Sequence, residues 1–177
     1  DAAKKDEESL KSEHKVIVWM TSSEGYKPLI KLYSKAATDY FYYVPRMDCK
    51  TLAEMWDKNL AISVPFFDSF LHKNTLSFSQ IVPSWGNLRP TFFVEDLHEL
   101  PFTPLIKKAV EQHCAANKYD ILPTHSIYYP DKSSFKSYMV FRAINNRSTF
   151  SKPELEHMSD STFCWQTYKE WWDGENL

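Results

Sequence analysis

Aromatic residues greatly outnumber glycines in this chain, and this imbalance limits both its folds and its chemistry. The 177 residues include 12 Phe, 10 Tyr and 6 Trp but only 3 Gly. Glycine supplies the left-handed turns and close backbone approaches that cradle phosphates, so Gly-rich nucleotide loops are excluded. The aromatic and aliphatic residues supply enough apolar surface for a packed core, and general disorder is therefore excluded as well.

The charge balance restricts the classes of partner. The chain carries 21 basic and 23 acidic side chains, which give a net charge of −2. Because no basic excess is present to neutralise phosphates, nucleic acid is not expected as the main partner. No run of about 18 apolar residues occurs, so we expect a soluble protein without a membrane-spanning helix, for which peripheral membrane contact remains open.

The ends and the cysteines of the chain indicate its organisation. Residues 1–14 carry mixed charges and predict a flexible arm, which leads into a single domain over residues 15–177. Cys49, Cys114 and Cys164 are odd in number and widely spaced, which favours a reducing intracellular compartment over a disulfide-linked secreted domain. The chain begins with Asp rather than Met, which is compatible with removal of a leader, including a mitochondrial presequence.

Residue periodicity predicts an α+β fold. Strands are expected over residues 15–21, 28–33, 38–44, 75–82 and 90–95, where aromatic and β-branched residues gather or alternate with polar ones. Helices are expected over residues 51–61, just after Pro65, and over 103–117, 134–144 and the C-terminal segment, with capping-box patterns at Thr51–Glu54 and Ser151–Glu154. Strands precede most of the helices, so the sheet is predicted to be antiparallel or mixed and packed by several short helices.

One acidic and histidine-containing cluster is a candidate catalytic site. Asp96 and His98 follow a predicted strand, and period-two alternation places them on one face, where the carboxylate can orient the imidazole. The alternative is that polar residues gather where a strand meets solvent. No further ligand follows at a metal-binding spacing, so neither a metal site nor a cofactor is expected.

Cys49 is a second candidate nucleophile. It lies beside Lys50 and just before Thr51, at the start of a predicted helix whose dipole can lower the pKa of a thiol. The alternative is an ordinary free thiol. His113 and Cys114 are adjacent in sequence, but neighbouring helical residues point about 100° apart, so they do not predict a catalytic pair.

Three segments carry a resemblance to a known family. Lys27-Pro28-Leu29-Ile30-Lys31-Leu32-Tyr33, Thr51-Leu52-Ala53-Glu54-Met55-Trp56 and Arg89-Pro90-Thr91-Phe92-Phe93-Val94 loosely resemble segments of the ubiquitin-like conjugating enzymes of autophagy. In that family a His-Pro-Cys signature supplies the cysteine that carries the thioester. Here His98 is followed by Glu99 and Leu100, so the resemblance implies a conjugation-type fold without that nucleophile.

The aromatic surplus toward the C-terminus suggests a function. Aromatic side chains dominate protein–protein hot spots, because they bury a large area at a small entropic cost. The residues expected to reach a partner are Tyr128, Tyr129, Trp165, Tyr168, Trp171 and Trp172. The leading hypothesis is a non-enzymatic accessory subunit or interaction module of a larger multiprotein assembly, which binds other protein subunits. The alternatives are that these rings belong to the core, and that the chain is a small hydrolase-like or conjugating enzyme.

Overall fold

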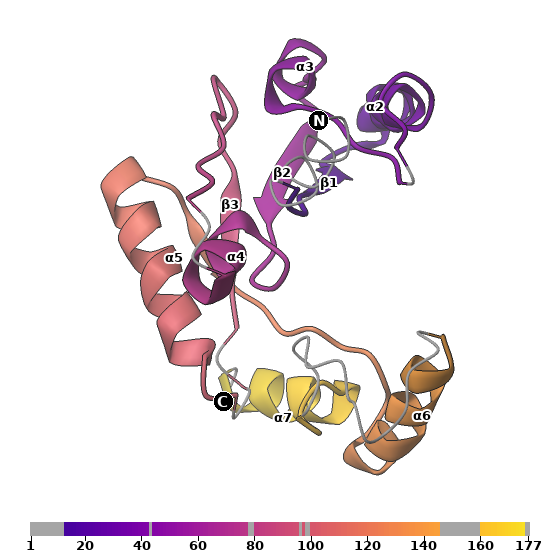
Figure 1. The fold of residues 1–177 in the computed structure, drawn as a ribbon, viewed down its shortest axis with the longest axis vertical. Coiled ribbons are helices and arrows are strands. Elements are labelled where there is room, and N and C mark those ends of the chain that lie inside the picture. The colour runs from indigo at the N-terminus through magenta and orange to yellow at the C-terminus, as the bar shows by residue number, and fades with distance from the viewer. Residues whose placement is uncertain are drawn as a thin grey trace, which may run out of the picture. The chain divides into compact units, whose positions relative to one another are not determined.

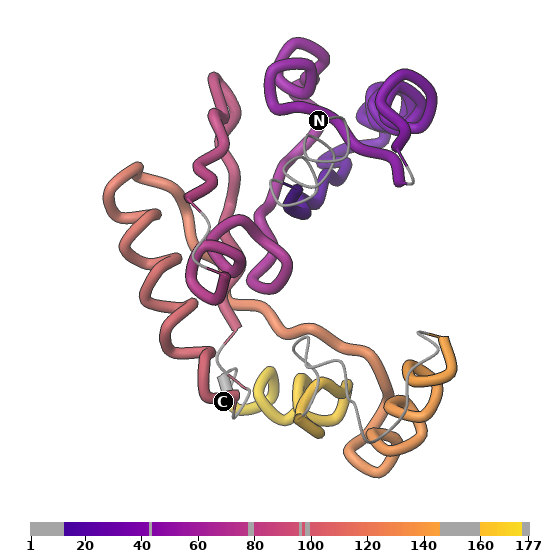
Figure 2. The backbone as a smooth tube through the Cα atoms, viewed as in Figure 1, coloured from indigo at the N-terminus to yellow at the C-terminus, as the bar shows by residue number. Residues whose placement is uncertain are grey.

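The computed structural model of the chain contains two compact units. Unit 1 comprises Asp1–Phe93 and Ala109–Leu122, and unit 2 comprises Val94–Lys108 and Pro123–Leu177. Residues 1–12 and the capping-box pattern at Ser151–Glu154 lie outside the described part of the chain. The described residues, whose path Figures 1 and 2 trace, are 13–42, 44–77, 80–95, 97, 100–145 and 160–175.

A four-stranded mixed sheet organises the fold. Its strands are β1 (Ile17–Met20), β2 (Leu60–Val64), β3 (Thr91–Val94) and β4 (Ile121–Pro123), in that spatial order. Strand β1 is antiparallel to β2, and β2 is parallel to β3. The prediction of an α+β fold with an antiparallel or mixed sheet is therefore confirmed.

Short helices connect and follow the strands. The 3-10 turn η1 (Ser23–Gly25), α2 (Tyr26–Thr38) and α3 (Cys49–Glu54) lie between β1 and β2 in the chain. Helix α4 (Phe70–Ser77) precedes β3, and α5 (Thr103–Asn117) precedes β4. Unit 2 adds η2 (Lys132–Ser134), α6 (Phe135–Asn145) and α7 (Trp165–Glu175). None of the helices in the described part of the chain is long and apolar enough to cross a membrane.

The core of unit 1 is built from aromatic side chains of the sheet and the helices. In β2 the side chains of Leu60, Ile62 and Val64 are buried, and in β3 that of Phe92 is buried. The Phe70 ring of α4 meets the Phe92 ring edge-on at 6.2 Å. Phe66, Phe67 and Leu71 are buried as well.

Helix α5 has the same bounds as its prediction. Its side chains Ile106, Val110 and Cys114 are buried at positions i, i+4 and i+8, the spacing of one helical face. Full burial of an aliphatic side chain contributes about 1.5–3 kcal/mol, so this stripe fixes α5 in the fold. Leu105, one position away from Ile106, points outward with 59% of its surface exposed.

The predicted strands over residues 28–33 and 38–44 are wrong. Helix α2 runs over Tyr26–Thr38. In the rest of the range 38–44, the described residues form only an isolated bridge between Tyr42 and Val44. The many tyrosines favour a strand locally, but Leu32 is buried on a helical face and that burial decides the conformation. Pro28 lies in the first turn of α2, where a missing N–H is tolerated.

Two further boundaries differ from their predictions. The helix expected over residues 51–61 is α3, which ends at Glu54, and the second half of that range contains the start of β2. Its N-cap is Asp48, whose carboxylate accepts the Thr51 backbone N–H at 2.8 Å, rather than Thr51 itself. The strand expected over residues 75–82 is wrong, because 75–77 belong to α4 and 80–82 contain no strand.

Gly25 is required by a close backbone approach. A Cβ at this position would lie 2.4 Å from the Asn59 carbonyl oxygen, which is part of the main chain and cannot rotate away. We expect Gly25→Ala to lower the free energy of unfolding by about 1–3 kcal/mol, as overpacking does. Gly174→Ala is the control, because its Cβ meets nothing within 4 Å. Thermal and urea unfolding measure the stability of both variants. Equal stabilities of the two variants would contradict the predicted clash.

His113 makes the stability of unit 1 depend on pH. Its ring packs against Phe70 and Phe92, each at 5.3 Å, and against Tyr119 at 5.9 Å, and burial lowers the pKa of its imidazole below 6.5. Between the folded pKa and 6.5, the unfolded chain binds this proton and the folded chain does not. Stability should therefore fall as the pH drops from 6.5 and level off below the folded pKa. His113→Phe should flatten this part of the profile in urea titrations; an unchanged profile would contradict the assignment.

Candidate functional site

The predicted pair Asp96 and His98 lies outside the described residues. Their neighbour Glu95 is described, and it is buried with 4% of its surface exposed. Its carboxylate accepts the Ser126 backbone N–H at 2.9 Å and the Ser126 hydroxyl at 2.6 Å. Glu95 therefore has a structural role, since it ties the end of β3 to the segment that follows β4.

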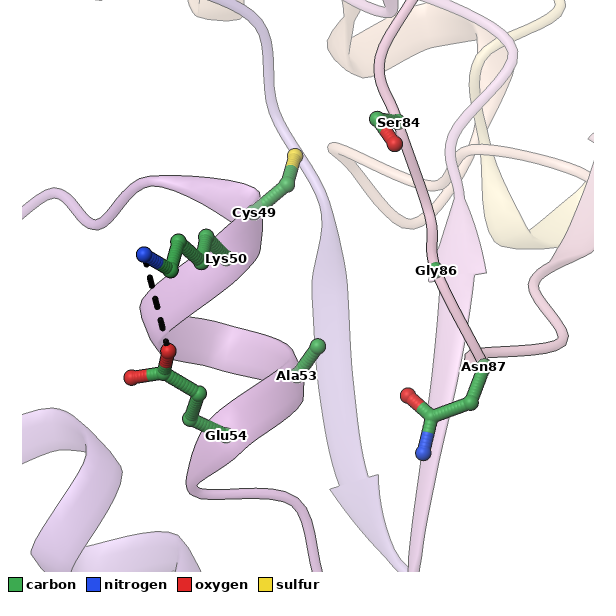
Figure 3. A pocket seen from close by; sticks show the side chains of 7 residues that line it. All are labelled: Cys49, Lys50, Ala53, Glu54, Ser84, Gly86 and Asn87. Atoms are coloured by element: carbon green, nitrogen blue, oxygen red, sulfur yellow. Dashed lines mark ion pairs between the residues drawn. The ribbon is translucent and has the colours of Figure 1, made fainter.

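Cys49 lines an open hollow in unit 1. The hollow has a volume of about 370 Å³, and its walls are α3 and the segment Ser84–Asn87. Figure 3 shows Cys49 and Ala53 pointing from α3 toward that segment, which turns at Gly86 with a φ of 59°. Lys50 and Glu54 also line the hollow, and they form an exposed ion pair at 4.0 Å.

The electrostatics at Cys49 oppose nucleophilic chemistry. Burial raises the pKa of its thiol, and the neighbouring Asp48 carboxylate raises it further. Hydrogen bonds from the Thr51 backbone N–H and hydroxyl lower the pKa of Asp48, so this carboxylate stays charged at neutral pH. The helix start therefore presents a protonated thiol rather than the thiolate that the sequence suggested.

The described residues contain no group of three or more metal-binding side chains. This finding covers His, Cys, Asp and Glu. The three cysteines are free, and Cys114 and Cys164 are buried. Burial raises the pKa of Cys114 to about 11, so this thiol is inert at neutral pH.

Helix α7 collects four of the six residues predicted to bind a partner. The Tyr168 ring is the centre of the group: it lies 5.3 Å from the ring of Trp165, 5.7 Å from that of Trp171 and 6.1 Å from that of Trp172. Such ring pairs contribute about 0.5–1.5 kcal/mol beyond the area they bury. We call Trp165, Tyr168, Trp171 and Trp172 the α7 cluster.

Unit 2 holds the start of α7 firmly. The Trp165 backbone N–H donates to the Tyr129 carbonyl at 3.0 Å, which satisfies an amide that the first turn of a helix leaves open. Phe163 and Cys164, just before the helix, have 0% of their surface exposed. The His125 ring stacks on the Tyr168 ring at 6.3 Å with an interplanar angle of 8°. These contacts therefore fix the position of the α7 cluster within unit 2.

The six predicted residues differ in exposure. Trp165 and Trp172 are each 52% exposed and Tyr128 is 40% exposed, so these three reach solvent. Tyr129 is buried, and its hydroxyl donates to the Asp160 carbonyl at 2.9 Å. Tyr129 therefore belongs to the core of unit 2, and this burial raises its pKa.

Two exposed apolar stripes escaped the sequence reasoning. In α6, Phe141 is 67% and Ile144 is 72% exposed, and neither is among the residues predicted to reach a partner. In α2 the exposed large apolar side chains are Tyr26, Ile30 and Tyr33. Their spacing of i, i+4 and i+7 is the signal that identifies the α2 stripe once the segment is seen as a helix.

In comparison with known proteins, the chain matches no protein-family model and no curated protein sequence. The segments that resemble the conjugating enzymes of autophagy fall in α2, in and just after α3, and in and just before β3. That resemblance stays an expectation.

The thiols should react in a fixed order. At neutral pH we expect a thiol reagent to modify only the half-buried Cys49 of the folded chain, and more slowly than in urea, because its pKa is raised. Cys114 and Cys164 should react only on unfolding. Mass spectrometry of timed samples locates the label, and Cys49→Ser is the control. If folded Cys49 reacted faster than the unfolded chain, it would be an activated nucleophile.

Proposed function

We propose that the chain is a non-enzymatic interaction module, an accessory subunit that binds another protein through the α7 cluster. The observation that carries the proposal is the half-exposure of two tryptophans, Trp165 and Trp172, on one stripe of a well-anchored helix. Tryptophan is the residue type most enriched at binding hot spots, and a single ring buries about 150–250 Å² when a partner covers it.

The geometry of α7 supports a docking role. Its apolar sector is wider than the part that packs on unit 2: Tyr168 and Trp171 are half-buried, whereas Trp165 and Trp172 continue the sector into solvent. Positions i, i+3 and i+7 place Trp165, Tyr168 and Trp172 along one line on the helix surface. Such a line is the pattern of anchors by which a helix binds an apolar groove or the apolar face of another helix.

The polar rim of the stripe suits a polypeptide partner. Lys169, Glu170 and Asp173 are exposed on the remaining face of α7 and carry both signs of charge. The Glu170 carboxylate accepts the Gln166 side-chain amide at 2.9 Å and pairs with Lys132 at 3.7 Å. An apolar centre with a mixed polar rim is the usual composition of a protein–protein interface.

The thiols fit a reducing compartment. Cys49, Cys114 and Cys164 are all free. Disulfides form and persist in oxidising environments, whereas free thiols are usual inside cells. We therefore place the proposed assembly in a reducing intracellular compartment.

The test compares two variants of the full chain. Trp165→Ser with Trp172→Ser removes the exposed anchors, and Phe141→Ser is the matched control, because Phe141 is exposed on a different helix of unit 2. Proteins captured from native extract are quantified for each variant, and binding of each purified candidate is then measured. We expect the double variant to weaken binding by about 30-fold or more, as loss of a hot spot does, and the control to change it little.

Two outcomes would contradict the proposal. Equal affinity of the wild type and the double variant for every captured protein would show that α7 is not the docking surface. Sedimentation that revealed a dimer, dissociated by the double variant, would show that a second copy of the chain covers the α7 cluster. Circular dichroism of both variants separates either result from a loss of folding.

A further inference from the structure

Helix α2 of unit 1 has one face that packs inward and another that is apolar and exposed. Leu32 is buried and Leu29 half-buried, so one face packs on unit 1. Tyr26, Ile30 and Tyr33 form a second face, the α2 stripe, with 59%, 44% and 62% of their surfaces exposed. At positions i, i+4 and i+7 these side chains lie along one line, whose length is about 10 Å at the helical rise.

Lysines border the α2 stripe. Lys27 follows Tyr26, Lys31 follows Ile30, and both are exposed. The thirteen residues of α2 include three lysines and no acidic side chain, in a chain whose net charge is −2. Lys35, the third lysine, pairs with Asp39, so Lys27 and Lys31 carry the positive charge beside the stripe.

We propose that α2 binds the surface of an anionic lipid bilayer, with the helix axis parallel to the membrane plane. The α2 stripe enters the boundary between headgroups and acyl chains, and Lys27 and Lys31 contact lipid phosphates and carboxylates. An exposed apolar stripe beside basic residues is the pattern of helices that lie in the membrane interface. Tyrosine suits this depth because its ring is apolar and its hydroxyl reaches water.

The charge of α2 favours a membrane over a protein as the occupant. The rim of α7 mixes Lys169 with Glu170 and Asp173, whereas α2 carries only positive charge. Three side chains also cover too small an area for a specific protein interface, which buries about 1,200–2,000 Å² in total. A bilayer has no such minimum area, because a short apolar stripe can insert into it. Each lysine near an anionic surface also raises the binding constant by about a factor of five.

The test is vesicle binding by the full chain. Partition is measured by co-sedimentation with vesicles of phosphatidylcholine alone and with vesicles containing about one third phosphatidylserine. We expect binding to the anionic vesicles that weakens at high salt, because salt screens the lysines. We expect at least tenfold weaker binding to the neutral vesicles.

Paired variants separate the site from the overall charge. The double variant Lys27→Gln with Lys31→Gln should reduce partition to anionic vesicles by about tenfold or more. The control, Lys108→Gln with Lys136→Gln, removes the same charge from exposed sites in α5 and α6. It should change partition by less than about threefold. Ile30→Ser with Tyr33→Ser should abolish binding. Phe141→Ser with Ile144→Ser removes apolar side chains that are at least as exposed, and it should retain binding.

The proposal is overturned by an absence of vesicle binding, by equal partition to neutral and anionic vesicles, or by equal effects of the α2 and control variants. Circular dichroism shows whether the Ile30 and Tyr33 variant folds. If it does not, the comparison of the Lys27 and Lys31 variant with its control tests the proposal. The Trp165 and Trp172 variant should bind vesicles normally, so the failure of one proposal does not imply the failure of the other.

Discussion

The architecture of unit 1 depends on the packing of one ring, that of Phe70. Only 1% of its surface is exposed, and it contacts the rings of His14, Trp85, Phe92 and His113 at 5.3–6.4 Å. These partners come from the segment before β1, the turn before β3, β3 itself and α5. One side chain therefore joins parts of the chain that are distant in sequence. The same contacts surround the His113 imidazole with carbon, and this is why burial lowers its pKa.

Helices α2 and α7 share a property that the core does not require: the apolar sector of each is wider than the part that packs on its own unit. In α2 the unused part is the tyrosine-containing stripe at 44–62% exposure, and in α7 it comprises Trp165 and Trp172. Exposed apolar surface of this kind is retained where a partner covers it. The charges distinguish the two proposed partners, because lysines are the only charged residues within α2, whereas α7 carries both signs beside the α7 cluster.

Sequence reasoning succeeded where the apolar spacing was regular and long. It found α5 and α6 almost to the residue, and it predicted a helix in the C-terminal segment, where α7 lies. It failed over residues 28–44, because the tyrosines there give a composition typical of strands. Leu32 is the one buried apolar residue described in this range, and a single position cannot define a helical period. It also missed β2, because a short apolar run such as Leu60–Val64 fits a helix or a buried strand equally well. The strand predicted over residues 28–33 concealed the α2 stripe, because its residues share one face only on a helix.

The three glycines bear on the two proposals, both of which rest on exposed side chains rather than on backbone groups. Gly25 allows a close approach to the Asn59 carbonyl, Gly86 adopts a left-handed turn, and Gly174 has open space around it in α7. The close approach at Gly25 belongs to the fold, and Gly86 lines the hollow beside Cys49. The hollow beside Cys49 is lined largely by small and polar side chains, and its thiol is held protonated. Both proposals therefore rest on rings and lysines at helix surfaces, and such surfaces suit extended partners better than small molecules, which require a concave pocket to bury most of their area.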